Sequence, residues 1–519
     1  MPESNCTPHK HQGDSLGKRY VYKLLTNLVS LPVYFVTQAI IPRGLGPQAY
    51  GDFNFLTNFF SQVMGFLDMG TSIGFYTKLS QRPHETALVS FYFYFLVVSV
   101  ITLLGGVAVA TQTSLFPVIW PHQEIWFIYL AAVWAIMTWV LQLVQKMTDS
   151  YGLTVNSEIA RMLQRIAGMV LIVILFWFNL LHLNSLFFLN FLVMGLLIFG
   201  LVYIIRRGMS SIKLLSLSLN QIKIYIKEFY QYSHPLFIYA LVGLIAGIFD
   251  RWLLQVFGGS IEQGYFGLAY QIGAGCFIFT SAMTPLLMRE FAIAFERRDL
   301  NLMAALFRRY IPMFYAIAAY LSCFILVQAD KVVYFVGGEK FSGAVVPLMV
   351  MALYPMFQTY GQLSGSVFYA TGQTALYRNI GVIILILGLP VTYFLIAPHA
   401  ALGLDTGATG LGVKMVFVQV LGVNVMLYYN AKVLNLQFWR YVGHQVLSLA
   451  GLLAIAFIAK LMVAMSMPVN KYMVLQFLVA GMIYTVIVIV AFVIKPDFFG
   501  LNREDIVMVF NKMRGKLIN

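Results

Sequence analysis

Apolar runs of about 20 residues recur along the whole chain, and this is the length that an α-helix needs to cross a lipid bilayer. Hydrophobic residues make up 60% of the 519 residues and charged residues only 10%, which is not the composition of a soluble domain. A transmembrane barrel would alternate apolar and polar residues over segments of about ten residues, and that pattern does not recur here. The sequence therefore predicts an all-α polytopic membrane protein.

We expect about 14 transmembrane helices, arranged as two six-helix repeats followed by a C-terminal pair. Their approximate bounds are 21–41, 54–77, 88–110, 126–146, 166–181, 185–205, 234–256, 264–286, 310–328, 344–369, 379–397, 409–430, 443–465 and 472–494. The predicted segments are a cytoplasmic polar tail (1–19), an N-terminal lobe (20–210), an amphipathic cytoplasmic linker (211–233), a C-terminal lobe (234–430), two additional helices (431–494) and a cytoplasmic tail (495–519).

The distribution of positive charge tests this topology. If both termini are cytoplasmic, 27 of the 34 lysines and arginines fall on the cytoplasmic side, 4 on the opposite side and 3 within spans. Such a bias is the rule for membrane proteins, and it also accounts for the net charge of +14 without nucleic acid binding. The polar first 19 residues hold no apolar core of a signal peptide, so we expect the first span to direct insertion.

A short loop occurs twice in the sequence. Residues 46–53 read GPQAYGDF and residues 259–266 read GSIEQGYF, so that two glycines and a phenylalanine match at an offset of 213. A fixed offset of this size indicates a duplicated half-transporter, a common plan among transporters. In each repeat we expect a loop here between two spans, with SIEQ (260–263) as the second one.

An ionisable pair lies inside the seventh predicted span. Asp250 and Arg251 interrupt the apolar run that leads to Gly258. Charged groups within spans are costly and usually face a cavity or a partner, so this pair suggests a function. Neighbours at i and i+1 do not face each other on a helix, and we therefore expect Asp250 to pair with another helix or to take part in cation coupling.

Three stretches of the sequence carry a family resemblance: RGLGPQAYGDF with the following GFLDMG, DRWLLQVFGGSIEQGYFGLAYQIG with TPLLMREFA, and YATGQTALYRN with the later GATGLGVKMVF. They resemble the polysaccharide transporters of the MOP superfamily, and in particular the Wzx-like O-antigen or oligosaccharide flippases. The resemblance covers residues 20–430. It implies a V-shaped, two-lobed bundle that works by alternating access. It also implies a substrate of oligosaccharide on undecaprenyl pyrophosphate, flipped across a bacterial inner membrane, with other polysaccharide assembly proteins as further partners.

A pyrophosphate needs cationic groups, and the sequence offers several. Arg251 is the first candidate, although its depth of roughly 7–8 Å, at 1.5 Å per residue, also allows it to snorkel to the interface. Lys414 and Asp68 come next, with local salt bridges as the alternative. Four further cations form either an electrostatic funnel at the cytoplasmic mouth or ordinary positive-inside topology: Lys78, Arg161, Arg289 and Arg378.

Glutamines within or near spans, among them Gln142 and Gln145, either line a sugar-binding cleft or bond between helices. The sequence has no Walker-type phosphate loop and no HExxH or CxxC metal spacing. We therefore expect a non-enzymatic transporter without cofactor, driven by H⁺, Na⁺ or the substrate gradient. The alternatives are a MATE-type drug or metabolite antiporter and a lipid II flippase. A membrane-embedded sugar polymerase is disfavoured because the longest outer loop, around 329–343, is short.

Overall fold

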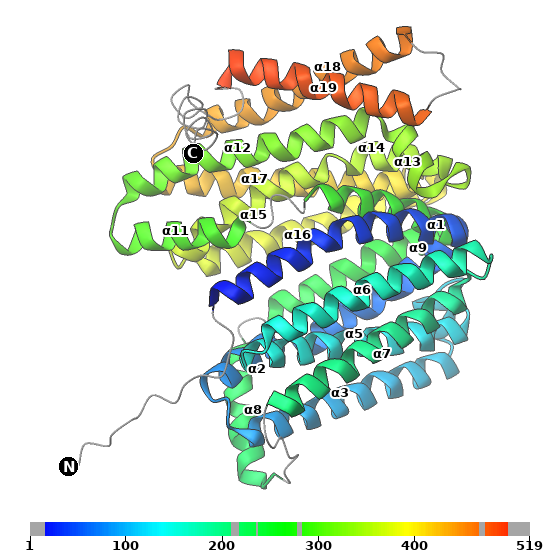
Figure 1. The fold of residues 1–519 in the computed structure, drawn as a ribbon, viewed down its shortest axis with the longest axis vertical. Coiled ribbons are helices and arrows are strands. Elements are labelled where there is room, and N and C mark those ends of the chain that lie inside the picture. Colours follow the sequence, from blue (N-terminus) through cyan, green and yellow to red (C-terminus); the bar gives the residue numbers. More distant parts are fainter. Residues whose placement is uncertain (1–15, 209–216, 235–236, 278–282, 467–472, 497–519) are drawn as a thin grey trace. The chain divides into compact units, whose positions relative to one another are not determined.

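The computed structural model describes residues 16–208, 217–234, 237–277, 283–466 and 473–496 (Figure 1). Within these ranges the chain is helical and contains no strand. Eleven of the described helices are long and apolar enough to cross a membrane. The predicted all-α polytopic class is confirmed. Most of both predicted tails and the first part of the linker (211–216) lie outside the described residues.

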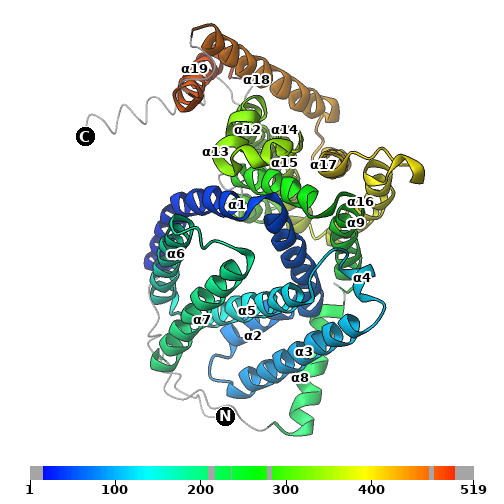
Figure 2. The same ribbon diagram turned by 90° about the vertical axis from the view of Figure 1, so that its right-hand side faces the viewer.

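The chain divides into two compact units, Met1–Leu45 with Asp52–Ile248, and Gly46–Gly51 with Phe249–Asn519. The helices up to the end of the linker are α1 (Leu16–Asp68), α2 (Thr71–Gln81), α3 (Thr86–Gln112), α4 (Phe116–Ile119), α5 (Ile125–Ser150), α6 (Thr154–Trp177), α7 (Leu183–Gly208) and α8 (Leu219–Ser233). In the first unit α7 packs on both α5 and α6, as Figure 2 shows.

The remaining helices are α9 (Phe237–Cys276), α11 (Thr284–Glu296), α12 (Leu300–Val327), α13 (Ala329–Gly337), η2 (Glu339–Ala344), α14 (Val345–Met351), α15 (Tyr354–Ala370), α16 (Thr374–Ile396), η3 (His399–Ala401), α17 (Gly407–Val433), α18 (Phe438–Ser466) and α19 (Met473–Ile494). The C-terminal pair α18 and α19 packs together in the second unit (Figure 1). Three fully buried tyrosines, Tyr315, Tyr360 and Tyr484, mark the core that α12, α15 and α19 share.

The two repeated loops are not loops in the structure. Predicted spans seven and eight form the single element α9, in which SIEQ is helical and only Gly259 leaves the helix, at φ 69° and ψ −171°. Its counterpart Gly46 does the same within α1, at φ 76° and ψ 171°. This region of φ and ψ is open to glycine alone, so one glycine turns each helix without a connecting loop.

The two turns pack against each other within the second unit. A Cβ atom on Gly51 would overlap the carbonyl oxygen of Ser260, and one on Gly264 would overlap the carbonyl oxygen of Pro47. Ser260 is the counterpart of Pro47 at the same offset of 213. Each repeat therefore uses its second matched glycine to let the backbone of the other repeat approach.

Three predicted boundaries are wrong. The second predicted span, 54–77, is broken between α1 and α2, where Met69 and Gly70 have φ of 41° and 75°. The fifth span is predicted at 166–181, but the corresponding helix α6 already begins at Thr154 and ends at Trp177. The eighth span ends earlier than its predicted bound of 286, because α9 ends at Cys276 and α11 begins at Thr284. The left-handed Met69 and Gly70 end α1, and hydropathy does not reveal them.

The linker helix α8 docks on the first unit. A capping box of Ser218 and Gln221 begins it. Its Phe229 stacks on Phe91 of α3, with ring centroids 5.5 Å apart. On the same helix, Ile226 and Tyr230 are exposed. This exposed apolar face agrees with the predicted position along a membrane surface, which stays a prediction.

Candidate functional site

Asp250 and Lys414 form an ion pair within the second unit. The ammonium of Lys414 on α17 lies 2.5 Å from Oδ2 of Asp250 on α9, and both side chains are largely buried, at 6% and 17% exposure. Thr392 of α16 donates its hydroxyl to Oδ1 of the same carboxylate at 2.7 Å. Three helices thus meet on one carboxylate, and both of its oxygens are occupied.

The packing of α16 against α17 makes room for the lysine. A Cβ atom on Gly388 of α16 would lie 2.8 Å from Cε of Lys414. Glycine at this position therefore lets the lysine stem pass between the helices toward Asp250. A buried ammonium without a carboxylate would carry a large desolvation penalty. Lys414 therefore needs both the carboxylate of Asp250 and the space that Gly388 leaves.

Arg251 turns away from Asp250, as expected of adjacent residues on a helix. Its guanidinium donates to Oε1 of Gln263 at 3.1 Å and lies over the ring of Phe266, 4.3 Å from the centroid. Gln263 in turn donates to the backbone carbonyl of Arg251. Arg251 thus links the two halves of α9 across the turn at Gly259, through a hydrogen bond and a cation–π contact.

Asp68 ends α1 instead of lying within a span. Its carboxylate accepts hydrogen bonds from the backbone N–H of Ser72 at 3.1 Å and from the indole of Trp139 at 3.1 Å. Lys146 donates to the Ser72 hydroxyl at 2.5 Å. The carboxylate thus satisfies a backbone N–H in the first turn of α2, and the predicted substrate-binding role of Asp68 stays a prediction.

The four mouth candidates have different surroundings. Lys78 pairs with Glu228 of the linker helix, and Arg82 reaches the same carboxylate at 2.7 Å. Arg289 is 72% exposed at its side chain and pairs with its neighbour Glu290. Arg378 is exposed and donates to its own neighbour Asn379. Arg161, in contrast, lines a cavity in the first unit.

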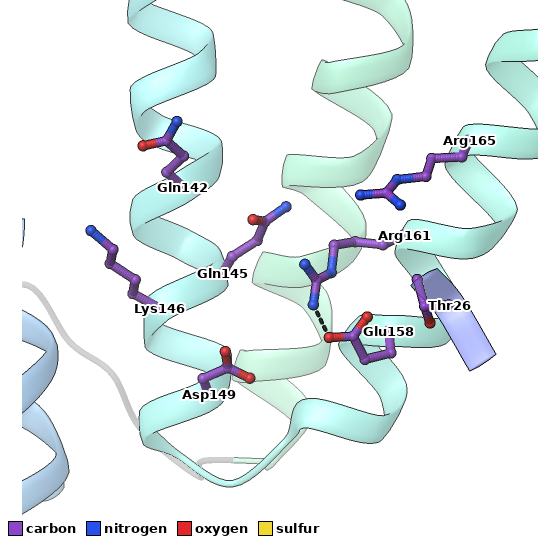
Figure 3. A pocket seen from close by; sticks show the side chains of 8 residues that line it. All are labelled: Thr26, Gln142, Gln145, Lys146, Asp149, Glu158, Arg161 and Arg165. Carbon is purple, nitrogen blue, oxygen red and sulfur yellow. Dashed lines mark hydrogen bonds and ion pairs between the residues drawn. The ribbon is translucent and has the colours of Figure 1, made fainter. Parts of the chain in front are cut away.

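That cavity has a volume of about 400 Å³ and lies where α5 ends and α6 begins (Figure 3). Its eight lining residues include three basic groups, Lys146, Arg161 and Arg165, and two acidic groups, Asp149 and Glu158. Figure 3 shows Arg161 and Arg165 reaching from α6 toward α5, whereas Lys146 points away from them.

Sequence reasoning overlooked several of these groups. Thr392 and Gln263 were not candidates, although Gln263 lies in the repeated loop. Arg165 and Lys146 counted only toward membrane topology. A usable signal was present in α6, because Glu158, Arg161 and Arg165 follow the i, i+3 and i, i+7 spacing of one helix face.

No family model and no curated protein matches this sequence. Among solved structures, the lipid II flippase MurJ in an inward closed conformation is similar with a TM-score of 0.67 and 10% identity, over 91% of this chain and 98% of that chain. An inward-facing multidrug resistance MATE family transporter of the MOP superfamily is similar with a TM-score of 0.58 and 16% identity, over 80% of this chain and 98% of that chain.

A MOP superfamily transporter from Pyrococcus furiosus is similar with a TM-score of 0.52 and 15% identity, over 80% of this chain and 96% of that chain. At such identities the likeness establishes the fold alone. The chain therefore has the fold of these transporters.

Proposed function

We propose that the protein is a flippase that moves oligosaccharide linked to undecaprenyl pyrophosphate from the cytoplasmic to the periplasmic leaflet of a bacterial inner membrane. It works by alternating access and is a transporter, not an enzyme. The observation that carries the proposal is the likeness to a lipid II flippase over 91% of the chain, because that protein handles a lipid-linked substrate by its own description. The resemblance of the quoted motifs to polysaccharide transporters supplies the class of sugar.

Charged groups within the helix bundle support transport of an anionic headgroup. Among the described residues, Arg251 contacts neutral groups, the amide of Gln263 and the rings of Phe266 and Tyr270. Its charge is therefore not matched by a carboxylate at hydrogen-bonding distance in those contacts. A guanidinium in such surroundings gains most from a phosphate oxyanion, which it can bind through two hydrogen bonds.

Energy coupling, in this proposal, acts through protonation of Asp250. Both carboxylate oxygens already have partners, Lys414 on Oδ2 and Thr392 on Oδ1. A proton removes the negative charge and with it the attraction that holds α17 to α9. Sodium would first have to displace the ammonium of Lys414, so we favour H⁺ over Na⁺.

Leaflet-resolved accumulation of lipid-linked oligosaccharide in a deletion strain tests the function. We expect carrier-linked sugar to build up on the cytoplasmic face and to clear when the gene is returned on a plasmid. Normal glycan export by the deletion strain would refute the proposal.

Two alternatives rest on the solved structures. A lipid II flippase is favoured by the TM-score of 0.67 with MurJ, and the deletion strain would then accumulate lipid II on the cytoplasmic face. A cation-coupled antiporter is favoured by the MATE structures. In that case the deletion strain would export glycan normally and become sensitive to cationic dyes.

A further inference from the structure

The cavity between α5 and α6 holds two arginines one helical turn apart. Arg161 and Arg165 occupy positions i and i+4 of α6, and both extend toward α5 (Figure 3). Like charges at this spacing repel each other and destabilise a helix. Their convergence on one cavity therefore needs a compensating negative charge.

One of the two acidic residues of the cavity compensates Arg161, and the other accepts a hydroxyl hydrogen bond. Glu158, with its side chain 3% exposed, pairs with Nη2 of Arg161. Asp149 accepts the hydroxyl of Thr154, the first residue of α6, at 2.9 Å. Among the residues that the structure describes, no carboxylate lies within ion-pair distance of Arg165, whose guanidinium donates to the hydroxyl of Ser30.

One donor in this cavity is left unsatisfied. Nε of Arg161 is buried and has no hydrogen-bond partner in the described part of the chain. A buried donor without a partner costs about 1–3 kcal/mol, and more when the group is charged. The cavity volume of about 400 Å³ falls within the range of roughly 300–1,000 Å³ that small ligands occupy. The site thus combines room, an unused donor, and a guanidinium, that of Arg165, that has no carboxylate partner in the described part of the chain.

We propose that Arg161 and Arg165, with the amide of Gln145, form a binding site for a phosphate or pyrophosphate oxyanion. Guanidinium groups hold such oxyanions through pairs of charge-assisted hydrogen bonds. Gln145 on α5 faces the arginines and supplies a neutral donor (Figure 3). Taken with the proposed flippase function, on which this step rests, the oxyanion is the pyrophosphate of the lipid carrier. The site then lies at the predicted cytoplasmic end of the first unit, where the substrate is loaded.

Binding to purified full-length protein in neutral-lipid nanodiscs tests the site. The probes are inorganic pyrophosphate and farnesyl pyrophosphate, measured by isothermal titration at constant ionic strength. We expect Arg165→Gln to weaken binding of at least one probe by about tenfold or more, because it removes one partner of a hydrogen-bonded charge pair. Gln145→Leu should weaken binding less. The exposed Arg297 lies in the second unit, and Arg297→Gln should bind as the wild type does.

The outcomes separate the site from the function. Tighter binding of farnesyl pyrophosphate supports a lipid-borne ligand, whereas equal binding of both probes supports a site for the soluble anion. Wild-type affinity in folded Arg165→Gln and Gln145→Leu, or heats that sodium chloride reproduces, would overturn the site. If Arg165→Gln loses binding while the deletion strain exports glycan normally, the oxyanion site stands and the proposed flippase function fails.

Discussion

The carboxylate of Asp250 and the ammonium of Lys414 meet across 164 residues of sequence, and the contact joins α9 to α17 inside an apolar bundle. A buried pair of this kind is costly to break from one side, because the remaining charge has no partner. A buried ion pair of this kind therefore need not increase the free energy of unfolding. In the proposed coupling, the loss of this contact would release α17 from α9.

Asp250→Asn should destabilise the protein by about 3–5 kcal/mol, because it leaves Lys414 as a buried unpaired cation. The double variant Asp250→Asn/Lys414→Met should recover most of that loss, which thermal unfolding of the purified variants would reveal as a strong coupling energy. Additive effects of the two substitutions would contradict the pairing. If Asp250 couples transport to protons, the double variant should fold and yet fail to respond to a pH gradient.

Arg251→Ala should abolish transport in a strain that depends on the plasmid-borne gene, with expression matched. Arg251→Lys keeps the charge but loses the planar stacking on Phe266 and the fork toward Gln263. We expect it to transport about tenfold more slowly, since a desolvated cation–π contact contributes up to about 2 kcal/mol. Wild-type transport by the alanine variant would refute the role of Arg251.

Gly264→Ala should destabilise the protein by about 1–3 kcal/mol or more. The added methyl group overlaps the carbonyl oxygen of Pro47 and forces the two backbone segments apart. Gly105→Ala in α3 is the matched control, since no atom lies within 4 Å of its new Cβ. There the change should be neutral or stabilising by about 0.5–1 kcal/mol. Equal unfolding temperatures for the two variants would show that the turns do not touch.

Docking of the linker helix α8 should depend on pH through Glu228. Partial burial alone would raise the pKa of Glu228, but the hydrogen bond and charge of Lys78, together with Arg82, outweigh it and lower the pKa. A lowered pKa means that the contact stabilises docking above the ordinary glutamate value of about 4.3 and is lost as the pH falls through the lowered value. Hydrogen exchange of α8 amides should therefore accelerate only below that range.

Glu228→Gln should give the same faster exchange of α8 at neutral pH, with little loss of global stability, because exposed ion pairs contribute only about 0–1 kcal/mol each. Glu290→Gln removes an exposed partner of Arg289 in the second unit and serves as the control. Unchanged exchange in Glu228→Gln would mean that the aromatic packing of Phe229 on Phe91 and the hydrogen bond from Tyr225 to Glu85 hold the helix without this ion pair.

Much of the fold follows from hydropathy, because each membrane span needs its own apolar run. The contacts between spans do not follow from hydropathy. The motif repeated at an offset of 213 marked the position of both turns. Its first glycines, Gly46 and Gly259, adopt a backbone conformation that is open to glycine alone. Nothing in the sequence indicates that Lys414 faces Asp250, because an apolar helix presents no polar face that would fix its rotation. Asp68 was misplaced since the left-handed Met69 and Gly70 end α1 within an apolar run.

The contact between the two turns also indicates how the two repeats arose. Gly51 meets the counterpart of Pro47, and Gly264 meets Pro47 itself, which is the isologous arrangement of a two-fold symmetric dimer. In a dimer of identical halves, every substitution would fall on both sides of the contact at once. Fusion into one chain removes that restriction. Glu262 now accepts a backbone N–H in the first turn of α17, from Ala408, at 2.7 Å, while its counterpart is Ala49, whose methyl group cannot accept one.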